Sequence, residues 1–190
     1  MVLIAFDALS NPINNYDLSS EINTYNFFVE IPAGTKQKWE VNKNTGNLEW
    51  EEKKGKKRVI NFINYPGNYG FIPQTLAGDG DPVDVVDLEE AIQRGEITKV
   101  KILGGMYFKD GKEEDIKFIA VANEGGIFSN YSTIEELFLD KPSVIEILKK
   151  WFESYKSPGK MIFYRFLGKE ESEDLISQAH KRWIEKNIKD

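Results

Sequence analysis

The sequence contains no cysteine and only one histidine in 190 residues. Without cysteine the chain has no disulfide framework, no thiolate zinc site and no cysteine nucleophile. No run of apolar residues approaches the roughly 18 that a membrane helix needs. The first basic residue is Lys36, so the N-terminal stretch lacks the basic or arginine-rich pattern of a targeting peptide. We therefore expect a cytoplasmic protein.

The net charge and the length of the chain exclude further classes of protein. The chain carries 25 Lys and Arg against 31 Asp and Glu, a net charge of −6. This balance disfavours a partner held mainly through nucleic-acid phosphates. The charged fraction of 29% and the hydrophobic fraction of 41% are typical of a soluble globular protein. The length favours one domain, and no repeat, low-complexity tract or Ser/Gly linker divides the chain.

Short strands punctuated by turns precede the helical patterns. Strands are predicted at 25–31, 38–41, 58–63, 83–88, 97–103, 116–122 and 161–166. A capping box at Ser143–Glu146, followed by apolar residues at helical spacing, predicts a helix that ends before Ser157–Gly159. A second helix is predicted from Glu171 to about Ile188. Because the strands do not alternate with helices, we expect an α+β or barrel-plus-helix domain rather than a parallel sheet.

The densest chemical signal is the acidic stretch 79–90, which holds six carboxylates and no basic residue. Such a stretch repels itself unless a cation neutralises it, and oxygen-only ligands suit Mg²⁺, Mn²⁺ or Ca²⁺. A solvated acidic loop is the alternative. Gly80 and Pro82 hold the backbone tightly between the acids, and valines 83, 85 and 86 follow at a strand start. The carboxylates are therefore expected to point into a metal site.

A second charged stretch, 109–117, contains Asp110-Gly111 as a hairpin tip, with Asp115 and Lys117 on one face of the strand that leaves it. Taken alone, this stretch also fits an exposed charged hairpin.

Basic and phenolic side chains supply the opposite charge and hydrogen-bond donors. Lys53–Arg58 is the only basic cluster, and it fits a nucleic-acid patch or a counter-surface for an anionic small molecule. Phosphate oxygens are bound by Lys, Arg and Tyr donors. Further residues of this kind are Lys38 beside Glu40 on one strand face, Tyr65 and Tyr69 around a turn, and Tyr155-Lys156 at a helix end.

Several of these blocks together resemble the soluble inorganic pyrophosphatases of family I, over about residues 25–164. The D-G-D-P-x-D-V stretch at 79–85 is the family's signature and is highly specific. The other blocks, in the family's order and approximate spacing, are Glu30-Ile31-Pro32, Lys38-Trp39-Glu40, Asn68-Tyr69-Gly70, Asp110 with Asp115-Ile116-Lys117, and Tyr155-Lys156.

The resemblance implies a mainly β fold with flanking helices: a closed, five-stranded, antiparallel OB-like barrel plus two helices in the C-terminal half. We expect a single pyrophosphatase domain over 1–190, with the barrel and active site with one helix at 25–170. The polar, turn-rich N-terminal strap at 1–24 lies outside the resemblance, and the C-terminal helix at 171–190 follows from the helical spacing of its apolar residues. Bacterial relatives are commonly hexamers and eukaryotic ones dimers, so a homo-oligomer of either kind is expected.

The resemblance also implies metal roles for particular acids. Asp79, Asp84 and Asp115 correspond to ligands of a first metal, and Asp84 would also touch a second, so that a water bridges the two ions. Asp110 and Asp115 correspond to ligands of a third, and Glu30 to a carboxylate that reaches a metal through water. The implied cofactor is Mg²⁺, several ions per site, with Mn²⁺ as a substitute.

The implied reaction is the hydrolysis of pyrophosphate to two orthophosphates by the bridging water, with no covalent enzyme intermediate. Asp81 corresponds to the acid–base partner of that water. Two metals lower the pKa of the water, and cationic donors neutralise charge on the departing phosphate. The implied phosphate-binding donors are Lys38, Arg58, Tyr69, Lys117, Tyr155 and Lys156, with Glu40 and Tyr65 behind them; Lys56 and Lys57 lie close enough to Arg58 to compete for its role.

Two other classes of function remain open at this point. An OB-type nucleic-acid module would use the Lys53–Arg58 run and aromatic stacking, although the acidic stretch would repel a phosphate backbone. A non-catalytic metal-binding protein would leave the basic and phenolic donors without a purpose. The single histidine, His180, lies beside an apolar helix face and is expected to be structural.

Overall fold

The computed structural model describes residues 11–19 and 21–189. Part of the expected N-terminal strap, residues 1–10 and 20, lies outside the described residues. The strap's remainder contains a short helix, α1 (Pro12–Asn15), which is capped by the Asn11 side chain accepting from the amide of Ile13 at 3.1 Å. Asn14 Oδ1 accepts a hydrogen bond from the indole of Trp183 at 2.9 Å, which ties α1 to the C-terminal helix.

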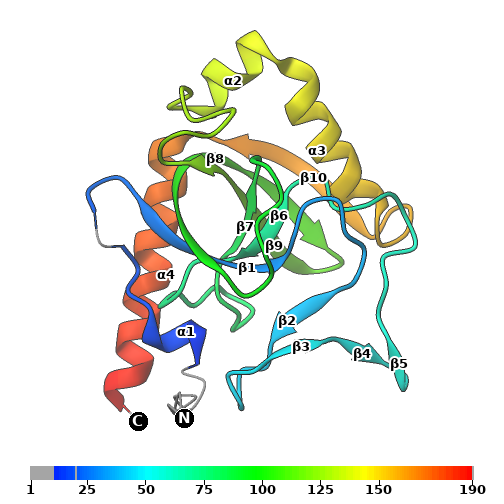
Figure 1. Cartoon of the computed structure of the whole chain (residues 1–190), viewed down its shortest axis with the longest axis vertical. Coiled ribbons are helices and arrows are strands. Elements are labelled where there is room, and N and C mark those ends of the chain that lie inside the picture. The colour runs from blue at the N-terminus through cyan, green and yellow to red at the C-terminus, as the bar shows by residue number, and fades with distance from the viewer. Residues whose placement is uncertain (1–10, 20, 190) are drawn as a thin grey trace, which may run out of the picture.

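The fold is mainly β with a few helices, as predicted, and one large sheet organises it (Figure 1). The five central strands are β1 (Tyr25–Ile31), β6 (Asn68–Phe71), β7 (Asp84–Asp87), β8 (Ile97–Asp110) and β9 (Glu113–Ala122). Their pairings run β1–β6–β7–β9–β8, and β8 pairs back with β1. A sixth strand, β10 (Met161–Leu167), pairs with the far end of β8.

The expectation of a wholly antiparallel arrangement is wrong for one pair, because β7 and β9 are parallel. A parallel pair needs a crossover of a dozen or more residues. Here the connection from residue 88 to residue 112 contains all of β8, which returns the chain so that β9 runs in the direction of β7. The same crossover places Asp84 directly beside Lys117 in the register.

Strand β8 extends well beyond the predicted 97–103 because the chain bulges at Leu103 and then continues in the strand through Gly104 and Gly105. The register with β9 shifts between Ile102 and Gly104. A Cβ at Gly104 would lie 2.5 Å from the carbonyl oxygen of Leu167, so glycine permits the close approach of β10. After the bulge, β8 continues to Asp110, and Gly111 (φ +66°) turns the chain into β9.

Two smaller hairpins extend from the sheet on one side (Figure 1). The first pairs β2 (Trp39–Val41) with β3 (Leu48–Trp50), and the second pairs β4 (Glu52–Lys53) with β5 (Lys56–Lys57). The predicted strand at 58–63 is wrong: within it the structure forms only an isolated bridge between Gln37 and Val59. Ile60 is buried, but Val59, Phe62 and Ile63 are 50%, 37% and 60% exposed, so the alternating burial that would favour a half-buried strand is absent there.

The C-terminal half contains three helices in the described residues, not the expected two: α2 (Ile134–Asp140), α3 (Pro142–Ser154) and α4 (Lys169–Lys189). Two of them fall within 25–170, where one was expected. Helix α2 begins at Thr133, whose hydroxyl accepts from the Glu136 amide at 3.2 Å. The predicted capping box is also wrong, because Pro142 starts α3 one residue before Ser143 and Lys141 is its N-cap.

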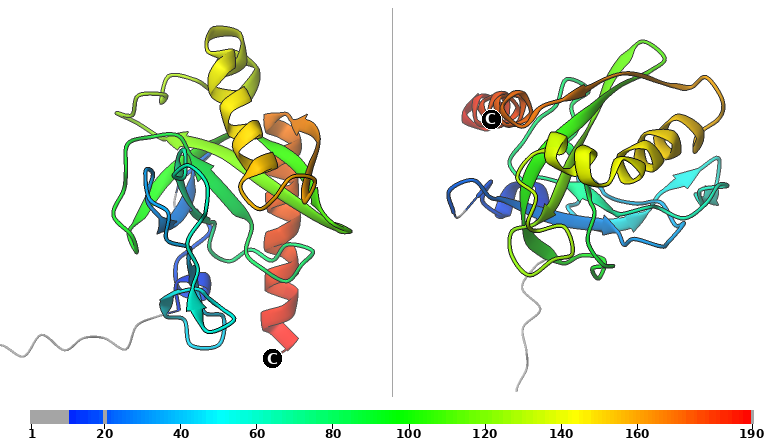
Figure 2. Two further views of the ribbon diagram at one scale, coloured as in Figure 1. Left: turned by 90° about the vertical axis from the view of Figure 1, so that its right-hand side faces the viewer. Right: turned by 90° about the horizontal axis from the view of Figure 1, so that it is seen from above.

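The helices cover the sheet from different sides (Figures 1 and 2). Helix α3 buries Ile145, Leu148, Trp151 and Phe152 in the main core cluster. Helix α4 contributes Ile176 and Ala179 to a second cluster. His180 is structural, as expected: its ring stacks on Trp183 and its Nδ1 lies 2.6 Å from the carbonyl oxygen of Gln74. Among the described helices, none has both the length and the apolar composition that crossing a membrane requires.

Asn68, fully buried at the start of β6, connects three segments. Its Oδ1 accepts from the amides of Ala33 at 3.0 Å and Ile92 at 2.9 Å, and its Nδ2 donates to the Asp87 carboxylate at 2.8 Å and to the Glu90 carbonyl at 2.8 Å. Burial raises the pKa of Asp87 to about 7, although the bond from Asn68 opposes the shift. The folded protein therefore takes up a proton at Asp87 more readily than the unfolded chain does.

This shift predicts a pH dependence of stability. Because the folded pKa of Asp87 lies above its unfolded value, its contribution is most favourable below about pH 4 and is lost as the pH rises to about 7. The cost above that range is on the order of 4 kcal/mol. Asp87→Asn should remove this part of the slope in urea unfolding between about pH 4 and pH 8. Identical slopes in the two proteins would contradict the prediction.

The tight pairing of β6 with β1 gives a second prediction. A Cβ at Gly70 would lie 1.9 Å from the carbonyl oxygen of Phe28, so Gly70→Ala should destabilise the fold by about 3 kcal/mol. Gly78→Ala is the matched control, since its Cβ would meet no heavy atom within 4 Å. Urea midpoints measure both, and equal losses in the two variants would contradict the close approach.

Candidate active site

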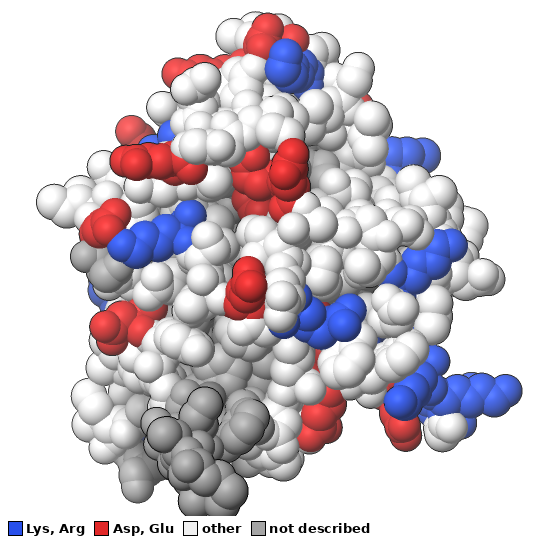
Figure 3. Space-filling view, in the orientation of Figure 1, with Lys and Arg blue, Asp and Glu red and all other residues white. Residues whose placement is uncertain are grey.

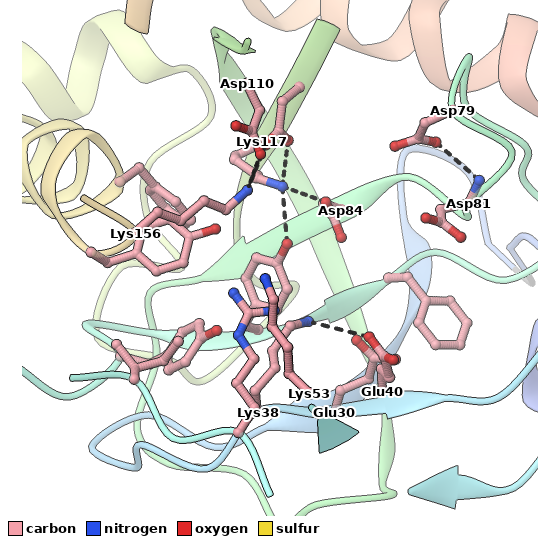
Figure 4. A pocket seen from close by; sticks show the side chains of 18 of the residues that line it. Glu30, Lys38, Glu40, Lys53, Asp79, Asp81, Asp84, Asp110, Lys117 and Lys156 are labelled. Carbon is pink, nitrogen blue, oxygen red and sulfur yellow. Dashed lines mark hydrogen bonds and ion pairs between the residues drawn. The ribbon is translucent and has the colours of Figure 1, made fainter. Parts of the chain in front are cut away.

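A cavity of about 1230 Å³ lies where the central strands, the two small hairpins and the end of α3 meet (Figure 4). All the residues selected from the sequence line it: Glu30, Lys38, Glu40, Arg58, Tyr65, Tyr69, Asp79, Asp81, Asp84, Asp110, Asp115, Lys117, Tyr155 and Lys156. Segments as far apart as β1 and the end of α3 thus contribute to one site.

Lys117 on β9 lies at the inner end of this cavity and is only 3% exposed. Its ammonium forms ion pairs with Asp84 and, at 2.5 Å, with Asp115, and it donates to the Tyr69 hydroxyl at 3.0 Å. Burial alone would lower the pKa of Lys117, but the two carboxylates raise it well above its ordinary value. The parallel β7–β9 register produces this arrangement, because it aligns Asp84 with Lys117.

A second cation, Lys156, comes from the segment that follows α3. Its Nζ donates to Asp110 Oδ2 at 2.6 Å and lies 3.8 Å from Asp115 Oδ2. The hydrogen bond from Lys156 lowers the pKa of Asp110. The neighbouring Tyr155 is fixed by stacking on Trp151, with 4.6 Å between ring centroids. The end of α3 is therefore held against the β8–β9 turn.

The loop before β7 carries the first two acids of the signature. Gly80 adopts φ +85°, which lets the Asp81 amide donate to Asp79 Oδ1 at 2.9 Å. Burial raises the pKa of Asp79, and the bond from the Asp81 amide opposes that shift. Asp81 forms an ion pair with Lys43, from the β2–β3 turn, which lies on another wall of the cavity.

Glu30 on β1 is buried and accepts a hydrogen bond from the Val41 amide at 2.7 Å. Burial raises the pKa of Glu30 to about 7, with the nearby Lys38 opposing the shift. Lys38 lies 4.0 Å from Glu40, and its ammonium is 5.4 Å from the centre of the Tyr69 ring. Glu30 from β1, Lys38 just before β2 and Glu40 in β2 thus place one cation among two carboxylates on one wall of the cavity.

Arg58 donates two hydrogen bonds to Glu51, at 2.9 and 2.7 Å. Of the three cations that could compete in this stretch, Arg58 lines the cavity, whereas Lys56 and Lys57 do not. Sequence reasoning did not single out Lys43, Lys53, Glu113, Glu114 and Lys160 as site residues, although they also line the cavity. Lys53 belongs to the basic cluster noted in the sequence, whereas no sequence pattern marked Lys43.

The donor set fits a hard divalent cation. The five acids predicted to bind metal come from four segments, with Glu30 on β1, Asp79 and Asp84 in or just before β7, Asp110 on β8 and Asp115 on β9. They offer only oxygen ligands, which Mg²⁺ and Mn²⁺ favour. Within the described residues, no three acids form a ready coordination group. The ammonium groups of Lys117 and Lys156 lie between Asp84, Asp110 and Asp115 and balance their charge.

The buried position of Lys117 predicts a large stability effect. The Lys117 side chain is 4% exposed, and those of Asp84 and Asp115 are 33% and 16% exposed. Lys117→Met leaves the two partly buried carboxylates without their shared cation and should cost about 3 kcal/mol. Lys156→Met is the matched control, because its side chain and that of Asp110 are 24% and 33% exposed; we expect about 1 kcal/mol there. Urea unfolding measures both, and equal losses would show that burial does not strengthen the Lys117 pairing.

Comparisons with known proteins agree with this geometry. A family model described as inorganic pyrophosphatase matches residues 27–184. The inorganic pyrophosphatase of Nanoarchaeum equitans is 37% identical over 164 residues, covering 82% of this chain and 95% of that protein. The probable inorganic pyrophosphatase of Plasmodium falciparum is 30% identical over 202 residues, covering 92% of this chain and 53% of that protein.

A solved structure shows the same likeness in three dimensions. The type I inorganic pyrophosphatase of Toxoplasma gondii matches with a TM-score of 0.85 and 26% identity, over 92% of this chain and 88% of that one. The chain spans nearly all of the Nanoarchaeum relative and about half of the Plasmodium relative. Because the family model covers most of the sequence and the fold agrees, the chain belongs to the inorganic pyrophosphatase family.

Proposed function

We propose that this chain hydrolyses inorganic pyrophosphate to two orthophosphates in a reaction that depends on a divalent cation. The observation that carries the proposal is that one cavity brings together the acids of the family signature and six basic or phenolic donors. Carboxylates suit divalent cations, and the donors suit phosphate oxygens. A nucleic-acid module or a non-catalytic metal protein would use only one of the two sets.

The residues assigned to metal binding are Asp79, Asp84, Asp110, Asp115 and Glu30. Mg²⁺ is the proposed cofactor, with Mn²⁺ as a substitute. When bound, such ions lower the pKa of water and neutralise charge on the substrate. Lys117 and Lys156 already offset part of the acids' charge, so the site can hold several carboxylates close together before a cation binds.

The proposed phosphate donors are Lys38, Arg58, Tyr69, Lys117, Tyr155 and Lys156. Burial raises the pKa of Tyr69 well above its ordinary value, with Asp84 adding to the shift. Burial also raises the pKa of Tyr65, which supports the phosphate donors from behind with Glu40. Both phenols therefore keep their protons at neutral pH and act as hydrogen-bond donors, which suits the charge that develops on the departing phosphate.

Asp81 is the proposed proton acceptor for the attacking water, which adds directly to phosphorus without a covalent enzyme intermediate. Its carboxylate lies at the cavity wall with a half-exposed side chain, and Lys43 pairs with it from the opposite hairpin. An acid in this position can accept a proton from water and release it to solvent.

We also propose the closure of the barrel, the single domain, the oligomeric state and the cellular location. The return of the strand pairings to β1 supports a closed five-stranded OB-like barrel, within a single domain over residues 1–190. The expected homo-oligomer, dimer or hexamer, and the cytoplasmic location are kept as proposals that rest on the resemblance and on the composition.

Orthophosphate release from pyrophosphate tests the function. With Mg²⁺ the protein should turn over rapidly, and EDTA should abolish the activity. Asp81→Asn should lower kcat by about 100-fold, since general acid–base groups contribute at least that much. Asp140→Asn, an exposed change on α2 away from the cavity, controls for the loss of a carboxylate. Absence of turnover in the folded, Mg²⁺-replete protein would contradict the proposal and favour a metal-binding module.

A further inference from the structure

The signature loop, residues 76–82, projects into the cavity region from a closed base. At that base the Thr75 hydroxyl accepts a hydrogen bond from the Val83 amide at 3.0 Å. Within the loop the Ala77 amide donates to the Asp81 carbonyl at 2.7 Å. These bonds fix the backbone of the loop, whereas the Asp81 side chain is half exposed. The direction of the Asp81 carboxylate therefore needs a contact from elsewhere in the chain.

Lys43, from the turn between β2 and β3, makes that contact. Its ammonium forms an ion pair with the Asp81 carboxylate and donates to the Gly80 carbonyl at 3.4 Å. Among the residues that the structure describes, no other side chain forms a hydrogen bond or an ion pair with this carboxylate. Asp79, in contrast, is held within the loop by the Asp81 amide at 2.9 Å (Figure 4). Lys43 is thus what directs the Asp81 carboxylate.

The turn that carries Lys43 is itself held in one conformation. Asn42 Oδ1 accepts from the Asn44 amide at 3.0 Å, and the Asn42 carbonyl accepts from the Gly46 amide at 2.7 Å. A Cβ at Gly46 would lie 2.7 Å from the Cα of Asn11, so the turn packs directly against the residue that caps α1. The backbone of Lys43 therefore has a fixed position relative to α1.

Helix α1 also contacts the base of the signature loop. The Ile13 carbonyl accepts from the Gln74 amide at 2.7 Å, and the Gln74 side chain donates to the Asn14 carbonyl at 3.3 Å. Because α1 contacts both segments, the fold holds the backbone of Lys43 near Asp81 without help from the ion pair. Only the two side chains become ordered when they pair, and an exposed pair of this kind contributes little to stability.

We propose that Lys43 is a positioning residue for the hydrolysis, which holds the Asp81 carboxylate where it accepts the proton of the attacking water. The inference rests on the proposed function. A proton acceptor must lie within hydrogen-bond reach of the proton that it takes, and a displacement of about 1 Å can lower the rate by about 100-fold. Loss of Lys43 should therefore affect catalysis much more than it affects the stability of the fold.

Turnover of pyrophosphate in Mg²⁺ tests this role. Lys43→Met should lower kcat by about tenfold, because the carboxylate loses its direction. KM should change by less than about twofold, since the phosphate donors remain. Urea midpoints should match those of the wild type, which separates this loss from unfolding.

Lys54→Met is the matched control. Lys54 lies at the turn of the neighbouring β4–β5 hairpin and does not line the cavity. The lysines of the basic cluster gather over that hairpin, at the lower right of Figure 3. The variant removes one exposed ammonium, as Lys43→Met does, and should leave both kcat and KM unchanged.

A double-mutant cycle tests whether Lys43 acts through Asp81. In an Asp81→Asn background, Lys43→Met should lower kcat further by less than about twofold, because the group that Lys43 directs has already lost its function. A lysine that acted on the substrate or on a bound cation would instead cause the same tenfold loss in both backgrounds.

Three results would overturn the proposal. A tenfold loss that persists in the Asp81→Asn background would show that Lys43 does not act through Asp81. A rise in KM with kcat unchanged would make Lys43 a phosphate ligand. Equal kcat and KM in Lys43→Met and the wild type would reduce the pair to a surface contact. Absence of turnover in the wild type would instead overturn the proposed function.

Discussion

The site depends on one buried ammonium, Lys117, held between Asp84 and Asp115 and against the Tyr69 hydroxyl. Two carboxylates on neighbouring strands repel each other in a medium of low dielectric constant unless a cation lies between them. Lys117 supplies that cation from within the fold, and its pKa is raised well above its ordinary value as a result. The strands can therefore bring several acids to one cavity, where a divalent cation and an anionic substrate are proposed to bind.

The sheet's topology makes this pairing possible. β8 returns the chain so that β9 runs parallel to β7, and Asp84 then lies beside Lys117 in the register. Asn68 and Gly70 hold the adjacent strand β6 in place, the first by four hydrogen bonds to other segments and the second by allowing β1 to approach closely. Tyr69, between these two residues, is thereby directed at the Lys117 ammonium. The four-residue strand β6 therefore both holds the sheet together, through Asn68 and Gly70, and positions the Tyr69 hydroxyl in the cavity.

The sequence predicted strands with clear hydrophobic patterns, such as 25–31. It also predicted many residues of the cavity, because the signature at 79–85 and the other blocks of the resemblance fix residue types in a given order and spacing. It did not predict β6, where Pro66, Gly67 and Asn68 indicate a turn although the strand is fully buried. Nor could it predict the irregular, largely exposed 58–63 segment or helix α2, since tertiary packing outweighs local preference in such short segments. The Lys43–Asp81 and Lys117–Asp84 pairs join residues more than 30 positions apart, and no local pattern encodes distances of that kind.

Direct binding of Mg²⁺ to the protein without substrate tests most directly whether these acids form one cation site. Calorimetric titration should show saturable Mg²⁺ binding, and Asp84→Asn should weaken it by at least about tenfold, since it removes a charged ligand. Asp140→Asn, on the exposed end of α2, should bind as the wild type does. Saturable binding that Asp84→Asn leaves unchanged, or no saturable binding at all, would contradict the account.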